Sequence, residues 1–185
     1  MFSYKIDDDT ELRLLETRHA EELDALVTAN YDHIKEWAAW LKDTESPIEQ
    51  TREHIKRNRM QFAEGKGFNI FIWYQGKMVG KVGYNFFDWD NRQTELGYWL
   101  GASFQGKGLV TKSCRALIDY AFNELKLNRI EIRCGVENTK SRKIPERLGF
   151  REEGILRQAE WLHDHFIDLV VYGMLASEWR DKNKS

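Results

Sequence analysis

The stretch FQGKGLVTKSC, from Phe104 to Cys114, places two glycines and a lysine immediately before a helical pattern. The upstream segment TELGYWL alternates as a strand does, and the downstream segment has apolar residues at helical spacing. At the start of a helix, free backbone N–H groups and the positive end of the helix dipole converge, and together they bind anions. The sequence therefore predicts an anion-binding turn between a strand and a helix.

Several interpretations of this glycine turn stay open on the residues alone. Gly106 and Gly108 can simply permit a tight turn. A nucleotide P-loop fits poorly, because GxxxxGK is followed by Gly108 where Ser or Thr would hold Mg²⁺. A Rossmann turn also fits poorly, because the third glycine of GxGxxG would fall at Thr111. The remaining interpretation is a pyrophosphate held by backbone amides from about Gly106 to Val110, without a metal ion.

Composition and charge limit the class of protein. A chain of 185 residues suits one domain, 1–185, and 42% hydrophobic with 31% charged residues is ordinary for a soluble globular protein. The net charge of −2 gives no reason to expect a nucleic-acid partner. No apolar run approaches the roughly 20 residues that span a bilayer, and the acidic N-terminal stretch is unlike a signal peptide.

The cysteines and histidines carry little chemistry of their own in this sequence. Cys114 and Cys134 lack CxxC spacing, which indicates reduced core thiols in a cytoplasmic protein. The histidines show no ligand spacing with a carboxylate or a cysteine, so we expect no metal site.

The order of expected elements indicates an α/β or α+β domain on one mixed sheet, with a core from about 12 to 179. The expected elements are a strand from 12, a helix at 17–30, a helical piece at 34–41, a helix from 46 to about 65, a hairpin at 68–87, a strand at 94–100, the helix after the glycine turn, a strand from 129, a short helix from 138 and two closing strands. Thr17 can cap the first helix, and Ser46 with Pro47 provides a start for the third.

The glycine turn is similar to a known coenzyme-binding loop. The run Gln105-Gly106-Lys107-Gly108-Leu109-Val110 resembles the Q/R-x-x-G-x-G/A pyrophosphate loop of the GNAT (Gcn5-related N-acetyltransferase) superfamily, with Val110 replacing the usual small residue. ELGYW at 95–99 resembles the strand that carries the pantetheine arm in this superfamily. Asn138-x-x-Ser141, followed by ERLGF at 146–150, resembles its late helix and next strand.

A fourth motif narrows the resemblance to one branch. The residues that resemble the tail of the branch acetylating ribosomal-protein N-termini are Glu153, Gly154, Arg157, Asp168 and Tyr172. The resemblance extends from residue 12 to about 179. It implies a GNAT-like domain whose mostly antiparallel sheet splays between the fourth and fifth strands, with helices on both faces.

The resemblance also implies a reaction. Acetyl-CoA would be the donor, an amine would attack its thioester directly, and no metal would be needed. The amine must lose a proton, the oxyanion needs donors, and the thiolate can take up a proton. The coenzyme arm would lie in the splay between TELGYWL and RIEIRCGV. The residues expected to hold the coenzyme are Tyr98, Trp99, Leu100, Gln105, Gly106, Lys107, Gly108, Leu109, Val110, Thr111 and Asn138.

Two carboxylates are candidates for the general base. Glu160 lies in RQAEWLHD, an expected polar connection between the last two strands, and burial beside Trp161 would raise its pKa. Glu95 lies in a strand, on the same side as Gly97 and Trp99. The matching glutamate of the ribosomal-protein branch is a proposed base, which favours Glu160. Glu160 could instead be a solvated loop residue, and Glu95 could organise the sheet through hydrogen bonds.

The general acid departs from the common family pattern. Many GNAT enzymes place a tyrosine seven residues after the asparagine, and here that position holds Pro145. Ser141, one helical turn earlier and on the same face, is the substitute that the resemblance implies. It could also be a helix-start serine bonded to backbone. A thiol pKa of about 8.5 makes the thiolate a fair leaving group, so loss of the acid should cost less than loss of the base.

The favoured acceptor is the α-amine of a protein or peptide, whose pKa of about 8 lies well below the 10.4 or so of a lysine side chain. Trp37 and Trp40 would form an apolar wall of the acceptor cleft, unless they belong to helix core. Polyamines and aminoglycosides remain alternatives, which Asp88 and Asp90 could attract. A non-catalytic acyl-CoA sensor is a further alternative. The aromatic content and the apolar last strand are consistent with a homodimer.

Overall fold

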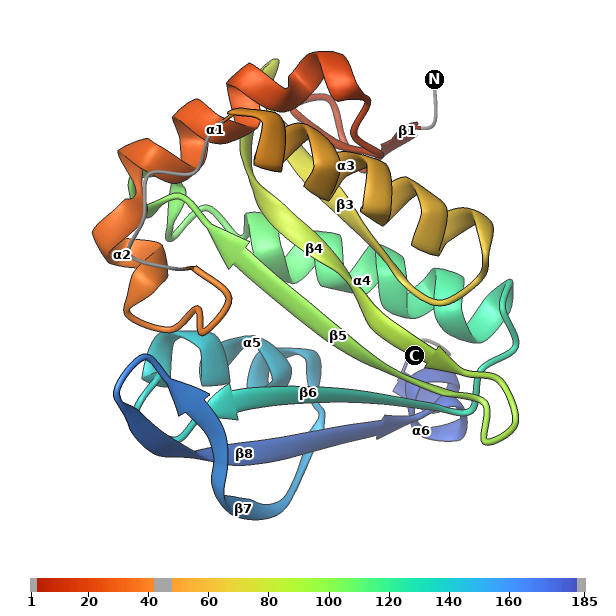
Figure 1. The fold of residues 1–185 in the computed structure, drawn as a ribbon. Helices are drawn as coiled ribbons and strands as arrows, with labels where there is room; N and C mark the ends of the chain where they lie inside the picture. The colour runs from red at the N-terminus through yellow and green to blue at the C-terminus, as the bar shows by residue number, and fades with distance from the viewer. Residues whose placement is uncertain (1–2, 42–47, 183–185) are drawn as a thin grey trace.

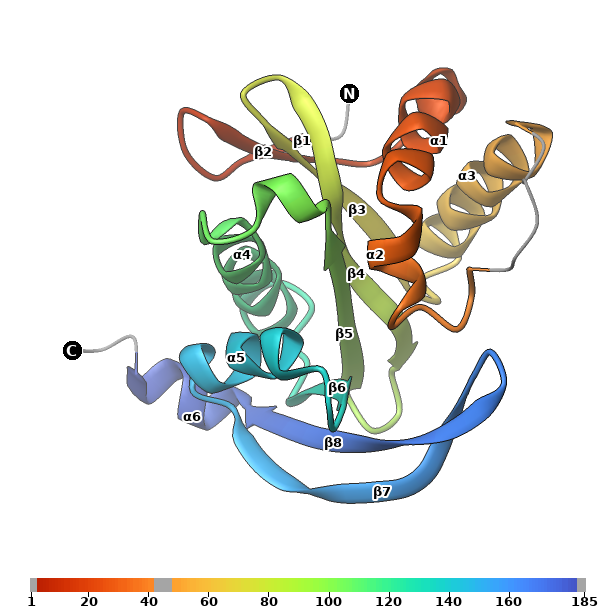
Figure 2. The same cartoon turned by 90° about the vertical axis from the view of Figure 1, so that its left-hand side faces the viewer.

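The computed structural model describes residues 3–41 and 48–182, which form an eight-stranded sheet with helices on both faces (Figures 1 and 2). The strands are β1 Ser3–Lys5, β2 Thr10–Arg13, β3 Phe68–Tyr74, β4 Lys77–Asp88, β5 Gln93–Leu100, β6 Arg129–Gly135, β7 Arg151–Leu162 and β8 His165–Leu175. The helices are α1 Ala20–Ala29, α2 Tyr31–Lys35, α3 Ile48–Ala63, α4 Leu109–Asn123, α5 Thr139–Leu148 and α6 Ala176–Lys182, with 3₁₀ turns at Thr17–His19 and Ala102–Phe104.

The strand order is β1-β2-β3-β4-β5-β6-β8-β7, and every neighbouring pair is antiparallel except β5 with β6. Figure 2 shows α1, α2 and α3 on one side of the sheet and α4 and α5 on the other. This confirms the expected mixed, mostly antiparallel sheet between two layers of helices. Within the described residues, no helix is both long and apolar enough to cross a membrane.

The larger core lies between α4 and the sheet. The helix buries an apolar face that includes Leu109, Leu117 and Ile118, and this face packs in one cluster with Leu96 and Ile130 from β5 and β6. Burying each large apolar side chain stabilises the fold by about 1.5–3 kcal/mol before entropy is counted. Because this apolar face packs on β5 and β6, α4 holds the glycine turn at its start against the ends of the central strands. A smaller cluster lies under α1 and α3 on the opposite face.

The parallel pair β5–β6 separates after a short ladder. Gln93, Thr94 and Glu95 pair with Arg129, Ile130 and Glu131, and no pairing is formed beyond them although β5 continues to Leu100 and β6 to Gly135. Backbone groups of β5 that face β6 beyond Glu95 therefore have no ladder partner in that strand. This is the splay that the sequence predicted between these two strands.

Four local expectations differ from the structure. The helical piece expected at 34–41 is the short helix α2 at Tyr31–Lys35, followed by turns. Thr17 does not cap α1, because it begins a 3₁₀ turn and His19 is the N-cap residue of α1. Glu16 caps the 3₁₀ turn, and its N–H donates to His19 Nδ1 at 3.0 Å. The first central strand begins at Thr10 rather than at residue 12, and β1 was not expected. The polar connection expected around Glu160 is strand, since β7 runs to Leu162. The predicted helix start at Ser46 and Pro47 lies outside the described residues.

Candidate active site

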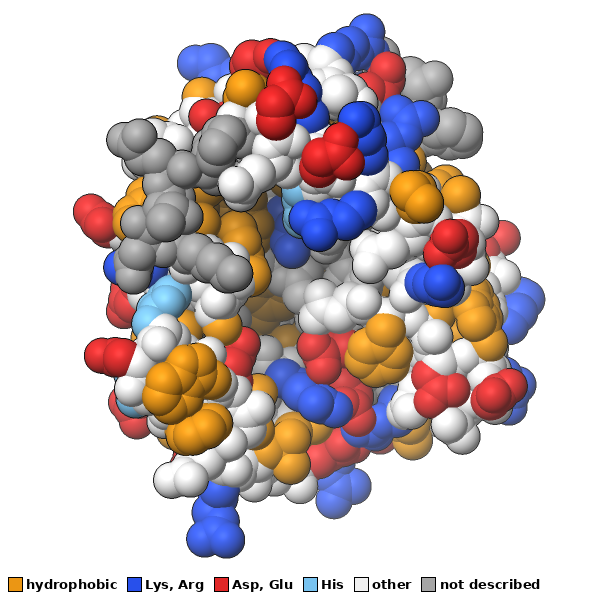
Figure 3. Space-filling view, in the orientation of Figure 1, with side chains coloured by type: hydrophobic (Ala, Val, Ile, Leu, Met, Phe, Trp, Pro, Cys, Tyr) orange, Lys and Arg blue, Asp and Glu red, His pale blue; other side chains and the backbone are white. Residues whose placement is uncertain are grey.

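A cavity of about 1000 Å³ opens where β5 and β6 separate. It is visible as a hollow in the face shown in Figure 3. Its lining comes from the glycine turn, α2, α5, both splayed strands and the last part of β7. Every predicted site residue except Lys107 lines it, so residues from 95 to 160 meet around one space. The ammonium of Lys107 instead lies 5.9 Å from the ring centre of Tyr74.

The glycine turn has the backbone conformation that only glycine adopts freely. Gly106 has φ +78° and Gly108 has φ +72°, and Gly108 is the N-cap residue of α4. A Cβ added at either position would meet no heavy atom within 4 Å, so the requirement is conformational rather than steric. No side chain caps the start of α4. The free N–H groups of its first turn therefore remain available at the cavity for an anion.

Cations that the sequence reasoning missed surround this turn. Lys140, Lys143 and Arg147 project from α5 and line the cavity. Lys140 Nζ lies 3.5 Å from Gln105 Oε1, and an Arg147 guanidinium nitrogen donates to Thr111 Oγ1 at 3.1 Å. These bonds bring the basic face of α5 to the glycine turn and add positive charge to its backbone donors. The signal was present in the run TKSRKIPERL, whose basic residues recur through the helix.

A neutral cluster joins the splay to the start of α5. Ser141 Oγ lies 3.4 Å from the Tyr98 hydroxyl and 3.3 Å from Cys134 Sγ, and Tyr98 donates to the Ser141 carbonyl at 2.9 Å. Asn138 caps the helix by accepting from the Ser141 N–H at 3.0 Å. Burial raises the pKa of Tyr98 and of Cys134, which keeps both groups protonated. The Ser141 hydroxyl is thus held among neutral hydrogen-bonding groups at the cavity wall.

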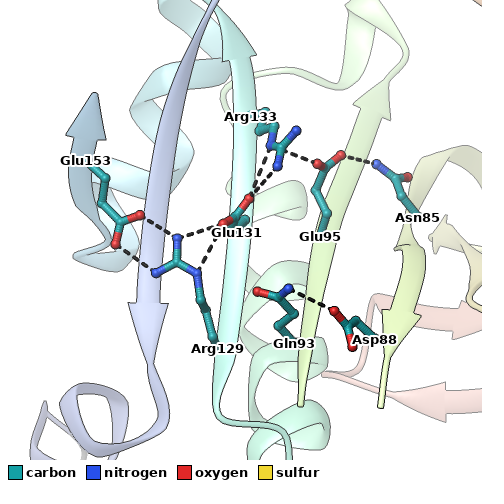
Figure 4. A network of polar contacts seen from close by, with 8 residues as sticks. All are labelled: Asn85, Asp88, Gln93, Glu95, Arg129, Glu131, Arg133 and Glu153. Atoms are coloured by element: carbon teal, nitrogen blue, oxygen red, sulfur yellow. Dashed lines mark hydrogen bonds and ion pairs between the residues drawn. The ribbon is translucent and has the colours of Figure 1, made fainter. Parts of the chain in front are cut away.

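Glu95 belongs to a polar network that crosses the sheet from Asn85 to Glu153 (Figure 4). Its carboxylate accepts from Asn85 Nδ2 at 2.6 Å and pairs with Arg133 Nε at 3.1 Å. Arg133 also pairs with Glu131 at 2.9 Å, and Glu131 pairs with Arg129 at 2.7 Å. Both carboxylate oxygens of Glu95 are therefore engaged within the sheet. This arrangement matches the alternative in which Glu95 organises the strands.

The far end of this network depends on a glycine. Arg129 of β6 pairs with Glu153 of β7 across the intervening strand β8, as Figure 4 shows. A Cβ on Gly173 of β8 would lie 2.3 Å from a Glu153 carboxylate oxygen. The absence of a side chain at Gly173 lets Glu153 reach over β8, which ties the edge strand β7 to the centre of the sheet.

Glu160 differs from Glu95 in having no partner among the described residues. It lies in β7 opposite Ile167 of β8 and lines the cavity. Within the described part of the chain its carboxylate makes neither a hydrogen bond nor an ion pair. Burial raises the pKa of Glu160, and the negative charge of nearby Glu95 raises it further. Trp161, which was expected to shield it, is half-exposed and packs on Phe166 with ring centres 4.7 Å apart.

The segment after α2 forms the wall opposite the splay. Trp37 lies close to Gly135 at the end of β6, where an added Cβ would meet its ring at 3.0 Å. Trp40 also lines the cavity and is 54% exposed, which argues against the alternative that Trp40 belongs to a helix core.

Asp88 and Asp90 do not line the cavity, and Asp88 is bonded to Asn91 and Gln93. The acidic pair thus gives no support to a polyamine acceptor.

Among the described residues, no three His, Cys, Asp or Glu side chains are grouped to hold a metal ion. The donors at the cavity are backbone amides and cationic side chains, and the carboxylate of Glu160 can accept a proton there.

Comparisons with known proteins agree with this geometry. Residues 10–151 match the family described as Acetyltransferase (GNAT) domain. The chain is 38% identical over 179 residues to the putative ribosomal N-acetyltransferase YdaF of Bacillus subtilis (strain 168), covering 97% of this chain and 98% of that protein. It is 30% identical over 171 residues to the ribosomal-protein-serine acetyltransferase of Escherichia coli (strain K12), covering 92% and 95%.

A solved structure of a similar protein contains bound coenzyme A. The structure of RimL, a ribosomal L7/L12 alpha-N-protein acetyltransferase, in complex with coenzyme A matches with a TM-score of 0.90 and 28% identity, over 96% of this chain and 99% of that chain. The chain belongs to the GNAT family and is an N-acetyltransferase. The two relatives and the solved structure are all named as acetyltransferases of ribosomal proteins.

Proposed function

We propose that this protein transfers the acetyl group of acetyl-CoA to the N-terminal α-amine of a protein, such as a ribosomal protein, by direct attack within a ternary complex. The observation that carries the proposal is one continuous cavity. It joins the glycine turn, at Gly106 and Gly108, to the carboxylate of Glu160, which has no partner among the described residues.

The cavity residues fit the parts of acetyl-CoA. The N–H groups at the start of α4 would hold the pyrophosphate, and Lys140, Lys143 and Arg147 would supply counter-charge. The unpaired backbone of β5 after Glu95 would hydrogen-bond the pantetheine arm and donate to the oxyanion that develops on the thioester carbonyl. When bound, the coenzyme supplies an activated acyl group and a thiolate leaving group.

Glu160 is assigned the role of general base. It would take a proton from the acceptor ammonium, directly or through a water, so that the free amine attacks. Burial and the charge of Glu95 raise its pKa, which makes it a stronger base than an exposed glutamate. Glu95 is already bonded to Asn85 and Arg133. Its proposed role is to place a negative charge near Glu160, which raises the pKa of Glu160.

Ser141 is assigned the role of general acid toward the departing thiolate. The Ser141→Ala variant should lose less than about tenfold in kcat, because a thiolate of pKa near 8.5 leaves without much assistance. Initial rates of free-thiol release measure this, with Thr139→Ala on the same helix turn as the matched control. A greater loss for Ser141→Ala than for Glu160→Gln would contradict this ranking.

The Glu95→Gln variant should shift the pH profile rather than abolish activity. Glu160 acts when deprotonated, so the acidic limb of kcat/KM follows its pKa. Burial raises that pKa first and the charge of Glu95 adds to it, so removal of this charge should move the acidic limb to lower pH. The profile of kcat/KM from acid to neutral pH measures the shift. Loss of activity at every pH would instead identify Glu95 as the base.

The acceptor class is tested by release of coenzyme A thiol over a panel of amines. The panel contains peptides with a free α-amine, the same peptides with a blocked N-terminus and an internal lysine, polyamines and aminoglycosides. We expect turnover with the free α-amines. Turnover with polyamines or aminoglycosides alone would make this a small-molecule acetyltransferase, and acetyl-CoA binding without turnover on any amine would favour the sensor.

A further inference from the structure

Lys81 places a cation on the acceptor side of the cavity. It lies in β4 opposite Trp99 of β5, so both side chains are on the sheet face that carries Glu95. The side chain lines the same cavity as Glu95 and Glu160. Its ammonium lies 5.9 Å from the ring centre of Trp40. Within the described residues it makes no hydrogen bond and no ion pair.

Burial alone accounts for the pKa shift of Lys81 among the described residues. It lowers the pKa of Lys81 to about 8, and no carboxylate of the described residues pairs with the ammonium to offset the cost of desolvation. Desolvation and then the charges of Lys81 and Arg57 lower the pKa of His54 on α3. Figure 3 shows Lys, Arg and His side chains bordering the hollow on its α3 side. A partly buried cation that has no partner among the described residues is costly, which points to a partner that arrives with the substrate.

The opposite part of the cavity is acidic. Glu95 and Glu160 lie together there, and Asp and Glu side chains border the hollow on that side in Figure 3. Along β5, the position facing Lys81 is four residues from Glu95, which is roughly 13 Å at about 3.3 Å per strand residue. An extended peptide whose ammonium lies at Glu160 would therefore present its third to fifth side chains near Lys81.

We propose that Lys81, with the ring of Trp40 beside it, is a carboxylate-binding subsite that selects acceptor peptides with an acidic side chain close to the free N-terminus. The proposal deepens the proposed function and rests on it for the position of the amine. It assigns specificity to Lys81 and leaves the proton transfers to Glu160.

The test compares amidated peptides that differ only by Glu or Gln at position three, four or five. The wild-type protein should acetylate the best Glu peptide with a kcat/KM about tenfold above its Gln counterpart, as expected for one charge-assisted hydrogen bond. The Lys81→Met variant should lower that ratio to about one while its rate on the Gln peptide and its KM for acetyl-CoA stay unchanged. Lys81→Arg should keep part of the preference. Lys77→Met, at the exposed start of the same strand, is the matched control.

A calorimetric titration separates this proposal from the proposed function. If no peptide is acetylated, the proposed function fails, but binding of the Glu peptide over the Gln peptide, lost in Lys81→Met, still supports the subsite. Equal binding and equal rates for the Glu and Gln peptides at all three positions would overturn it. Loss of activity on every peptide in a folded Lys81→Met variant would also overturn it, since Lys81 would then serve catalysis rather than selection.

Discussion

Replacing Glu160 with glutamine should lower kcat by roughly 10²- to 10⁴-fold, the usual contribution of a positioned general base. The amide has nearly the size of the carboxylate but cannot accept the proton of the acceptor ammonium. Glu160 makes no hydrogen bond or ion pair in the described part of the chain, so its replacement breaks no structural contact. Burial and the nearby charge of Glu95 disfavour its ionised form, so removal of the charge should not destabilise the fold.

The affinity for acetyl-CoA should stay unchanged in this variant, because Glu160 lies in β7, away from the glycine turn on β5–α4. Initial rates on a peptide acceptor and a calorimetric titration with coenzyme A separate the two quantities. Glu36→Gln is the matched control, since Glu36 is an exposed glutamate at the same cavity. A kcat equal to that of the wild type on a good acceptor would remove Glu160 from the mechanism.

Replacing both Gly106 and Gly108 with valine should reduce the affinity for coenzyme A by about 100-fold or more. An L-residue held in the left-handed region costs about 1–2 kcal/mol, and a β-branched residue costs more. Nothing lies within 4 Å of either added Cβ, so the turn can relax without a clash. Once relaxed, its N–H groups no longer converge on a phosphate, and the loss appears in binding rather than in folding.

Gly76→Val controls for strain alone. Gly76 has φ +77° and open space around an added Cβ, but it lies in the β3–β4 turn and does not line the cavity. Its replacement should lower the melting temperature by a few degrees and leave coenzyme A affinity intact. Undiminished coenzyme A binding by the Gly106/Gly108 double variant would show that the backbone turn does not hold the diphosphate.

Local patterns predicted the glycine turn and its flanking elements. The turn, the strand before it and α4 after it are specified by neighbouring residues, through glycine conformation and hydrophobic period. The strand position of Glu160 was missed for a local reason. A bulge between Leu156 and Glu160 and the positive φ of Gln158 interrupt the alternation of β7, so the stretch reads as a polar connection.

The contacts that Glu95 and Lys107 make with residues distant in the sequence could not be predicted from the sequence. The choice between Glu95 and Glu160 depends on Arg133 and Asn85, which reach Glu95 only through the register of β4, β5 and β6. The direction of Lys107, toward Tyr74 rather than the cavity, is likewise a property of the folded turn. Spacing along the chain carries no information on these pairings, because each joins elements that are far apart in sequence.

The most direct test of the account uses one peptide with a free α-amine and an internal lysine, incubated with the purified protein and acetyl-CoA. Fragmentation by mass spectrometry then locates the added acetyl group. The account predicts a single acetyl group on the α-amine, with release of one equivalent of free coenzyme A. Acetylation of the lysine side chain alone, or an unmodified peptide across a panel of N-terminal sequences, would contradict it.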